Sequence, residues 1–249
     1  MTGFTAEWLA LRAPADDAAR DAGLVRKLTG WAGTRRLRIA DIGGGSGAAH
    51  RALAPLLPNA QWRILDDDPD LLALIPKDAV AVETDLAASQ DAIFSPAPDL
   101  VTAFAFVDLV SESWLSAMVE RLAAASAALY APLTYDGLEV WRPEPPHEAE
   151  ALAAFNADMR RDKGFGPALG AAAASRLAAL LAERGYEVAM ALSPWRLTPG
   201  PLLSALAEGS AGAVRGRMPS DEIVAWSEGR RRASSAEIGH LDVLALPPS

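Results

Sequence analysis

The stretch Asp41-Ile42-Gly43-Gly44-Gly45-Ser46-Gly47 decides the fold of this chain. It follows the apolar residues 37–42, which we predict to be a β-strand, and precedes residues 48–57, which we predict to be a helix closed by Pro58. Glycine has no Cβ, so a loop with four glycines in five positions turns tightly and lets its backbone approach a ligand closely. The following helix adds free backbone N–H groups. We therefore interpret this segment as a ligand-binding loop rather than a plain turn.

The rest of the chain alternates predicted strands with predicted helices. Residues 100–106 are almost continuously apolar, as expected for a central parallel strand that is buried on both faces. The other predicted strands are residues 61–65, 79–83, 127–133, 186–192 and 239–246, with helices at 71–75, 112–124 and 171–184 between them. This alternation predicts an α/β fold with a doubly wound, mostly parallel sheet and helices on both faces.

Three segments lie outside that alternation. We interpret residues 1–33, with a helix break at Pro14, as an N-terminal helical cap. Residues 134–170 and 199–233 exceed ordinary connections and are rich in helical pieces, so we interpret them as cap or substrate-side insertions. The glycine-rich residues 162–167 fit either a lid hinge or a helix-capping turn. No linker or repeat interrupts the chain, which predicts a single domain over residues 1–249.

The composition narrows the class of protein. The formal net charge is −9, which disfavours nucleic acid as a partner, because phosphate binding needs clustered Lys and Arg. The chain has no cysteine, which excludes disulfides, thiolate metal sites and a cysteine nucleophile. No signal peptide and no membrane span are apparent in the sequence, so we expect a cytoplasmic protein that does not contact a membrane. The sequence does not determine the oligomeric state.

Acidic residues follow the second and third predicted strands. Asp66 ends the second strand more than twenty residues after the glycine loop, where a carboxylate accepts hydrogen bonds from both ribose hydroxyls of an adenosine. Asp67 is a weaker candidate, because the acids before Pro69 also fit a solvated turn. Asp85 follows the third strand, where a carboxylate accepts from an adenine amine while the backbone N–H of Leu86 donates to the ring. Helix capping is the alternative for Asp85.

These residues together resemble the class I S-adenosylmethionine-dependent methyltransferases. The resemblance covers roughly residues 35–135 and rests on Asp41-x-Gly43-x-Gly45-x-Gly47, Asp66-x-x-Pro69, Asp85-Leu86 and the strand run 99–103. It implies a seven-stranded sheet whose last strand is antiparallel and S-adenosyl-L-methionine as the cofactor. It also implies that Asp41 and the loop glycines surround the methionine part of that cofactor; these glycines are Gly43, Gly44, Gly45 and Gly47.

The chain also departs from the general pattern of that family. Residues 143–170 and 199–233 match no generic motif of the family. No Asn/Asp-Pro-Pro-Tyr/Phe motif follows the fourth strand, which disfavours methylation of base amino groups.

The acceptor is expected at the carboxyl ends of the strands. Residues 104–108 would face the reactive methyl, and Phe104 is a candidate cofactor contact. The candidate general bases are Asp108, Tyr135, His147 and, less favoured, His240. Three aromatic residues are candidates for lining a pocket for a flat acceptor, namely Trp141, Phe165 and Trp195. The three histidines are too scattered to predict a metal site. The favoured partner is an unidentified small molecule that accepts a methyl group.

Three alternatives remain open at this point. Gly43, Gly45 and Ala48 also satisfy the dinucleotide pattern G-x-G-x-x-A, so an NAD(P)-dependent oxidoreductase is one of them, although no Tyr-x-x-x-Lys pair is present. A non-catalytic module that retains the cofactor fold is the second. An RNA or protein methyltransferase is the third, disfavoured by the acidic net charge and by the lack of an appended binding domain.

Overall fold

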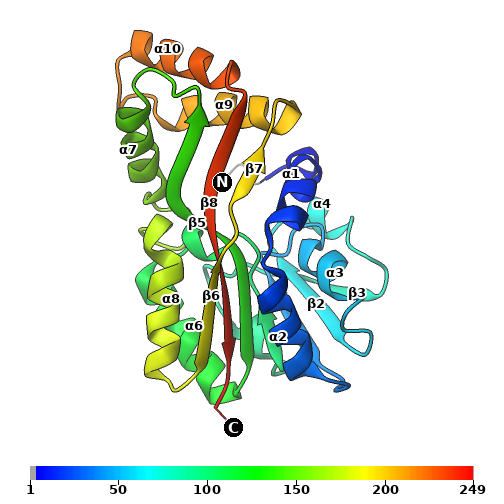
Figure 1. Cartoon of the computed structure of the whole chain (residues 1–249). Coiled ribbons are helices and arrows are strands. Elements are labelled where there is room, and N and C mark those ends of the chain that lie inside the picture. The colour runs from blue at the N-terminus through cyan, green and yellow to red at the C-terminus, as the bar shows by residue number, and fades with distance from the viewer. Residues whose placement is uncertain (1–3, 249) are drawn as a thin grey trace.

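The computed structural model describes residues 4–248, and these residues form one mixed sheet with helices on both faces (Figure 1). Within this range the sheet has eight strands in the order β3-β2-β1-β4-β5-β8-β6, and β7 pairs with β8. The strands are β1 (Arg38–Ile42), β2 (Gln61–Asp66), β3 (Ala79–Glu83), β4 (Leu100–Thr102), β5 (Ala128–Arg142), β6 (Glu187–Leu192), β7 (Trp195–Leu197) and β8 (Ser235–Leu246).

The first five strands are parallel, and β8 runs antiparallel to both β5 and β6. This arrangement confirms the predicted doubly wound, mostly parallel sheet and its antiparallel last strand. The strand beyond the seven expected is the short β7, which lies beside the first part of β8.

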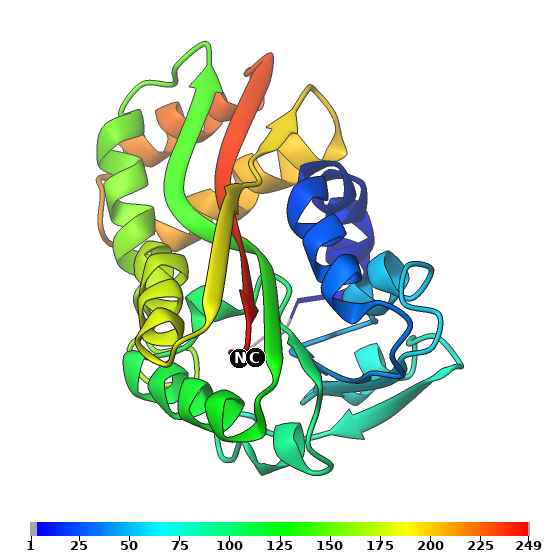
Figure 2. The ribbon, with the colours of Figure 1, turned by 60° about the horizontal axis from the view of Figure 1, so that its bottom comes forward.

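Helices cover both faces of the sheet because its central strands are apolar on both sides (Figure 2). Neighbouring residues on a strand point to opposite faces, so Val101 joins the core beneath α6 and α8, while Leu100 joins the core beneath α2 and α3. The helices are α1 (Ala6–Ala19), α2 (Ala22–Ala32), α3 (Ala48–Leu53), α4 (Pro69–Leu72), α5 (Asp91–Phe94), α6 (Glu112–Ala125), α7 (Glu148–Met159), α8 (Ala173–Glu183), α9 (Pro201–Ala213) and α10 (Ser220–Arg231), with 3₁₀ turns η1 (Val107–Leu109) and η2 (Gly170–Ala172). None of these helices, over residues 4–248, has the length and apolar character needed to cross a bilayer.

The fifth and last strands extend well past their predicted ends. β5 continues to Arg142, and β8 begins at Ser235, so residues 134–142 are strand rather than part of an inserted cap. The pairing shifts register twice, and Leu133 and Gly137 adopt positive φ at these irregularities. The extended strands, β7, α7, α9 and α10 form what we call the upper lobe, at the top of Figure 1.

The N-terminal helices meet at a different residue from the one predicted. α1 passes through Pro14, which lies on an exposed face of the helix, so the predicted break there is wrong. The chain turns instead at Arg20, because Asp21 caps α2 by accepting a hydrogen bond from the Leu24 N–H. The Asp21 N–H also donates to the buried Asp242 in β8 at 2.8 Å, which ties the junction to the sheet.

Candidate functional site

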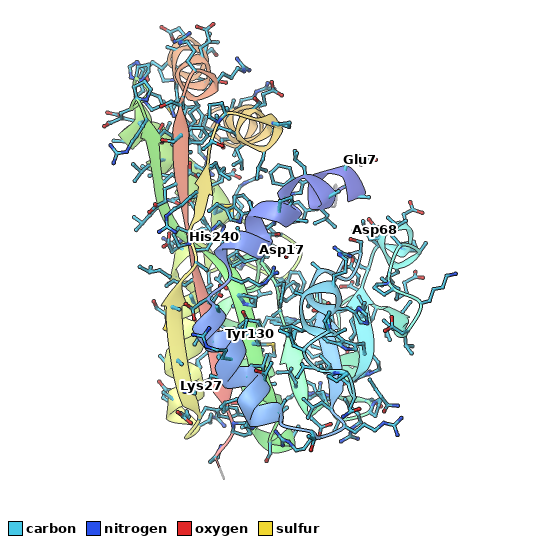
Figure 3. The ribbon with its side chains drawn as sticks, turned by 45° about the vertical axis from the view of Figure 1, so that its right-hand side comes forward. Glu7, Asp17, Lys27, Asp68, Tyr130 and His240 are labelled. Carbon is cyan, nitrogen blue, oxygen red and sulfur yellow. The ribbon has the colours of Figure 1, made fainter. Side chains whose placement is uncertain are left out.

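A cavity of about 1020 Å³ lies at the carboxyl ends of the parallel strands. Its volume is at the upper end of small-molecule sites, which span on the order of 300–1,000 Å³. The glycine loop, the segments after β2, β3 and β4, helix α1 and residues 162–165 line it. Figure 3 labels Asp17 on α1 and Asp68 after β2, and both residues line the cavity. The cavity therefore sits where an open parallel sheet binds its ligands.

The glycine loop approaches its neighbours too closely for any side chain. A Cβ on Gly43 would lie 2.4 Å from Cδ2 of Phe106, and Gly43 has φ of +59°. A Cβ on Gly44 would lie 2.6 Å from Oδ2 of Asp41. Gly43, Gly44 and Gly45 line the cavity, whereas Gly47 does not and instead begins α3 in a left-handed conformation. The loop backbone is therefore placed directly against Asp41 and Phe106.

Asp41 at the end of β1 is fully buried and lines the cavity. Its Oδ1 accepts a hydrogen bond from Oγ1 of Thr102 at 2.7 Å, while its Oδ2 has no partner within residues 4–248. Burial raises the pKa of Asp41 to about 7, against the lowering effect of the Thr102 hydroxyl. A buried carboxylate oxygen without a donor is unfavourable, so this atom is a ready acceptor for a cationic or N–H group of a ligand.

Asp66 at the end of β2 fixes the glycine loop. Its Oδ2 accepts from the Gly45 N–H at 2.8 Å, and its Oδ1 accepts from the Asp68 N–H at 3.1 Å. Burial is the main reason that the pKa of Asp66 is raised. Asp66, Asp67 and Asp68 all line the cavity, and cofactor contact by Asp66 and Asp67 stays a prediction. Each carboxylate oxygen retains further acceptor capacity toward a ligand.

Asp85 and Leu86 also line the cavity, after β3. Oδ1 of Asp85 accepts from the backbone N–H groups of Ala87 at 2.8 Å and Ala88 at 3.2 Å, in a turn that no helix continues, so Asp85 does not cap a helix. The Leu86 carbonyl accepts from Nε1 of Trp114 at 2.7 Å. These hydrogen bonds hold the segment in place at the cavity wall.

Among the candidate bases, Asp108 alone belongs to the segment that forms the cavity wall. Phe106 and Leu109 line the cavity on either side of it, and so does the predicted contact Phe104, although Asp108 itself is buried in η1. Its Oδ1 has no partner within residues 4–248. Burial raises the pKa of Asp108 to about 6, and the nearby positive charges of Lys163 and Arg12 oppose that rise.

Tyr135 and His147 do not lie where a base of this cavity is needed. Tyr135 is buried in the upper lobe, where its hydroxyl donates to Oε1 of Glu139 at 3.4 Å and burial raises its pKa. His147 begins α7, with Nδ1 4.0 Å from Glu222, and does not line the cavity. The expectation failed because the extension of β5 carries both residues away from the sheet's carboxyl edge.

His240 also lies outside the cavity lining. Its Nδ1–H donates to the Ile238 carbonyl at 3.0 Å, and burial lowers the pKa of the imidazole to about 3. It is therefore a neutral core side chain, in agreement with the structural role favoured for it from the sequence.

One of the three predicted pocket aromatics lines the cavity. Phe165 does, and it packs edge-to-face against Phe106 and Trp114 with ring centroids 5.5 Å apart in both pairs. Trp141 and Trp195 are instead buried in the core of the upper lobe. The apolar wall of the cavity comes from Phe4, Phe104 and Phe106 as well as Phe165.

Sequence reasoning missed the contribution of α1. Arg12, Asp16, Asp17 and Arg20 all line the cavity, and Arg12 forms a bidentate pair with Asp16, with Nε–Oδ2 at 2.9 Å and Nη2–Oδ1 at 3.1 Å. The spacing of Arg12, Asp16 and Arg20 places them on one helix face, which is the signal that identifies such a stripe. The α1 helix and Arg20 thus supply charged side chains to the cavity.

The segment 162–167 forms a turn held by Asp162, and it makes no side-chain cap to the helical residues that follow. Oδ1 of Asp162 accepts from the N–H groups of Gly164 at 2.7 Å and Gly166 at 3.0 Å. The Leu169 N–H donates to the Val110 carbonyl at 2.9 Å, which ties the segment to the wall after β4. These bonds hold Lys163 and Phe165 at the cavity.

No family model and no curated protein matches the sequence. Solved structures do match. The YcgJ protein from Bacillus subtilis is 14% identical with a TM-score of 0.53, covering 92% of this chain and 100% of its own. An O-methyltransferase family protein from Burkholderia thailandensis is 12% identical with a TM-score of 0.52, covering 98% of this chain and 58% of its own.

A third match is the phosphoethanolamine N-methyltransferase 2 from Haemonchus contortus, in complex with phosphomonomethylethanolamine and S-adenosylhomocysteine. It is 10% identical with a TM-score of 0.50 and covers 98% of this chain and 58% of its own. These likenesses show that the chain has the Rossmann-like fold of the class I S-adenosylmethionine-dependent methyltransferases.

Proposed function

We propose that this chain transfers a methyl group from S-adenosyl-L-methionine to a small molecule. The observation that carries the proposal is the unpartnered Oδ2 of buried Asp41, which lies in the cavity wall directly against the glycine loop. A buried acceptor of this kind is stabilised by a cationic donor, and the amino group of the cofactor's methionine part is one. When bound, the cofactor supplies an electrophilic methyl group on a sulfonium.

The remaining contacts fit an adenosine in the same cavity. Asp66, with Asp67 beside it, offers carboxylate oxygens to ribose hydroxyls, and Asp85 with the Leu86 backbone offers an acceptor and a donor to adenine. Phe104 follows β4 and closes the wall next to the loop. These residues hold and orient the cofactor.

The charge of the cavity favours this cofactor over a dinucleotide. Eight carboxylates and four cations line it. The carboxylates are Asp16, Asp17, Asp41, Asp66, Asp67, Asp68, Asp85 and Asp162, and the cations are Arg12, Arg20, Arg51 and Lys163. The pyrophosphate of NAD(P) would place its negative charges beside Asp41 and Asp66, whereas a sulfonium cofactor places positive charge there.

The reaction itself makes few demands on the protein. Orienting two reactants in a water-poor cavity supplies roughly 7–11 kcal/mol of the barrier in well-aligned systems. Where the acceptor must lose a proton, Asp108 is the proposed proton acceptor, because a carboxyl with a pKa of about 6 is charged at neutral pH. The size of the cavity fits a small acceptor beside the cofactor.

Calorimetric titration with S-adenosylmethionine, S-adenosylhomocysteine, NAD⁺ and NADH tests the proposal. We expect both sulfur ligands to bind wild type and to bind Asp66→Asn at least about tenfold more weakly, because a charged acceptor of the ribose is lost. Asp70→Asn makes the same change outside the cavity lining and should bind like wild type. Binding of NAD⁺ or NADH in place of the sulfur ligands would overturn the proposal in favour of an oxidoreductase, and binding of none would overturn it in favour of a module without cofactor.

A further inference from the structure

One part of the cavity carries no proposed cofactor contact. It is bounded by α1, by Phe106 and Leu109 after β4, and by residues 162–165. Its apolar lining residues are Ala13, Phe106, Leu109, Leu133 and Phe165. Such a surface accommodates an apolar, ring-sized body. We refer to this part as the acceptor end.

Lys163 provides a positive charge at the acceptor end. Its Nζ donates to the Met159 carbonyl at 2.8 Å and lies 3.7 Å from the Met159 sulfur. No carboxylate of residues 4–248 lies within 4.0 Å of it, although Asp108 and Asp158 are near enough to affect its pKa, which burial lowers. An ammonium has three donors, so Lys163 retains donors for a ligand in a half-buried position.

Arg12 provides a second cation from a distant part of the chain. Its Nε and Nη2 are occupied by Asp16, whereas its Nη1 has no hydrogen-bond partner within residues 4–248. Arg12 and Lys163 both lie near enough to Asp108 to lower its pKa, which places the two cations around the same 3₁₀ turn. The acceptor end therefore has donors on two walls and an apolar lining between them.

We propose that the methyl acceptor carries an anionic group, a carboxylate or a phosphate, and that Lys163 binds this group with help from Arg12. The apolar body of the acceptor then lies against Phe106 and Phe165. The negative charge of Asp108 limits how strongly an anion binds. Lys163 is the stronger of the two contacts, because it has no paired carboxylate whereas Arg12 is paired with Asp16. This inference rests on the proposed function, because it concerns the acceptor of that same cavity.

Small aromatic probes of different charge test this inference. Benzoate and phenyl phosphate represent the two anions, and benzamide is the neutral counterpart of benzoate. Each is titrated calorimetrically into the protein with and without saturating S-adenosylhomocysteine. We expect at least one anion to bind about tenfold or more tightly than benzamide, and the stronger of the two to identify the group. Lys163→Met should remove that preference and Lys163→Arg should retain it.

Two further variants complete the experiment. Lys27→Met removes a lysine that pairs with Glu187 away from the cavity, so it should keep the full anion preference. Arg12→Gln should weaken the preference by a smaller factor than Lys163→Met, because Asp16 already occupies two of its donors. Lys163→Gln repeats the loss of charge should Lys163→Met not fold.

The outcomes separate the two proposals. Equal binding of benzoate and benzamide, a preference unchanged in Lys163→Met, or dissociation constants above about 10 mM for both anions would contradict the anionic acceptor. If S-adenosylhomocysteine binds while any of these holds, only the acceptor proposal fails. If the anion preference is present while S-adenosylhomocysteine does not bind, methyl transfer fails and the anion site remains.

Discussion

Two buried carboxylates, Glu148 in the upper lobe and Asp41 at the cavity, differ in how many hydrogen bonds they accept from the protein. Glu148 accepts from Nε1 of Trp226 at 2.6 Å and from Nε of Arg230 at 3.1 Å, with a further bond from Nη2 of Arg230. Asp41 receives one hydrogen bond, from Thr102, and keeps one oxygen without a partner. Both carboxylates are removed from solvent, but only that of Glu148 is fully compensated by protein groups.

Glu148 belongs to a buried cluster with Glu139, Trp141, Trp226 and Arg230, which we call the Glu148 cluster and which connects elements of the upper lobe. Arg230 is fully buried, lies 4.4 Å from the ring centroid of Trp141 and 4.3 Å from that of Trp226, and pairs with Glu139 at 2.7 Å as well as with Glu148. It thereby joins β5, α7 and α10. A buried carboxylate whose hydrogen bonds are all made within the protein has no free acceptor for a ligand. A buried carboxylate that is incompletely paired and lies at a cavity keeps one. The difference separates a buried acid whose partners all lie in the protein from one that keeps an unpaired oxygen at the cavity.

The largest change in the free energy of unfolding is expected when the ion pairs of the Glu148 cluster are removed. Arg230→Met leaves two buried carboxylates without a counter-charge, which should lower the free energy of unfolding by about 3–5 kcal/mol. Unfolding in guanidinium chloride measures the change in the free energy of unfolding. Arg231→Met, next along α10 and exposed, should change stability by less than about 0.5 kcal/mol. A loss below about 1 kcal/mol in Arg230→Met would show that the cluster is not the support of the upper lobe.

Replacement of Asp41 should raise the free energy of unfolding at pH 8, whereas replacement of Arg230 should lower it. Its pKa is raised to about 7 in the folded state, from about 4 when unfolded, so the free energy of unfolding falls as the pH rises from about 4 to about 7. Asp41→Asn removes that fall and should stabilise the ligand-free protein at pH 8 by on the order of 1–4 kcal/mol, while weakening S-adenosylhomocysteine binding at least about tenfold. Thermal unfolding at pH 5 and pH 8 checks the stability. A variant less stable than wild type at pH 8 would show that the Asp41 charge is compensated within the protein.

A smaller loss of stability is expected when a side chain is added to the glycine loop. Gly43→Ala adds a Cβ at positive φ against the Phe106 ring, which should cost about 1–3 kcal/mol of stability and weaken cofactor binding. Gly30→Ala in α2 meets no atom within 4 Å and should be neutral or stabilising by up to about 1 kcal/mol. Urea unfolding and calorimetry on both variants measure these effects. Equal behaviour of the two variants would mean that the close approach at Gly43 is not needed.

Local sequence patterns were sufficient for the part of the molecule that carries the proposed cofactor contacts. The glycine loop, the acids after the strands and the strand–helix alternation are each encoded within a few neighbouring residues, and β3 lies at the predicted residues 79–83. Thr102, the partner of Asp41, was not singled out from the sequence and was identified only by its hydrogen bond in the structure.

The acceptor end and the upper lobe could not be read in the same way. Residues 134–142 were assigned to the inserted segment 134–170, although antiparallel pairing with β8 makes them strand. Arg12 and Lys163 come together only through the tertiary fold, because about 150 residues separate them. Their convergence depends on packing between segments, which no local pattern records.

The pH dependence of S-adenosylhomocysteine binding tests the central claim most directly. If the cofactor's amino group binds the charged form of Asp41, deprotonation of a carboxyl with a pKa of about 7 accompanies binding. Calorimetry should then find roughly tenfold tighter binding at pH 8 than at pH 6 in wild type, and no such difference in Asp41→Asn. The absence of binding at both pH values, or an equal pH dependence in the variant, would contradict the assignment of Asp41 and its cavity to this cofactor.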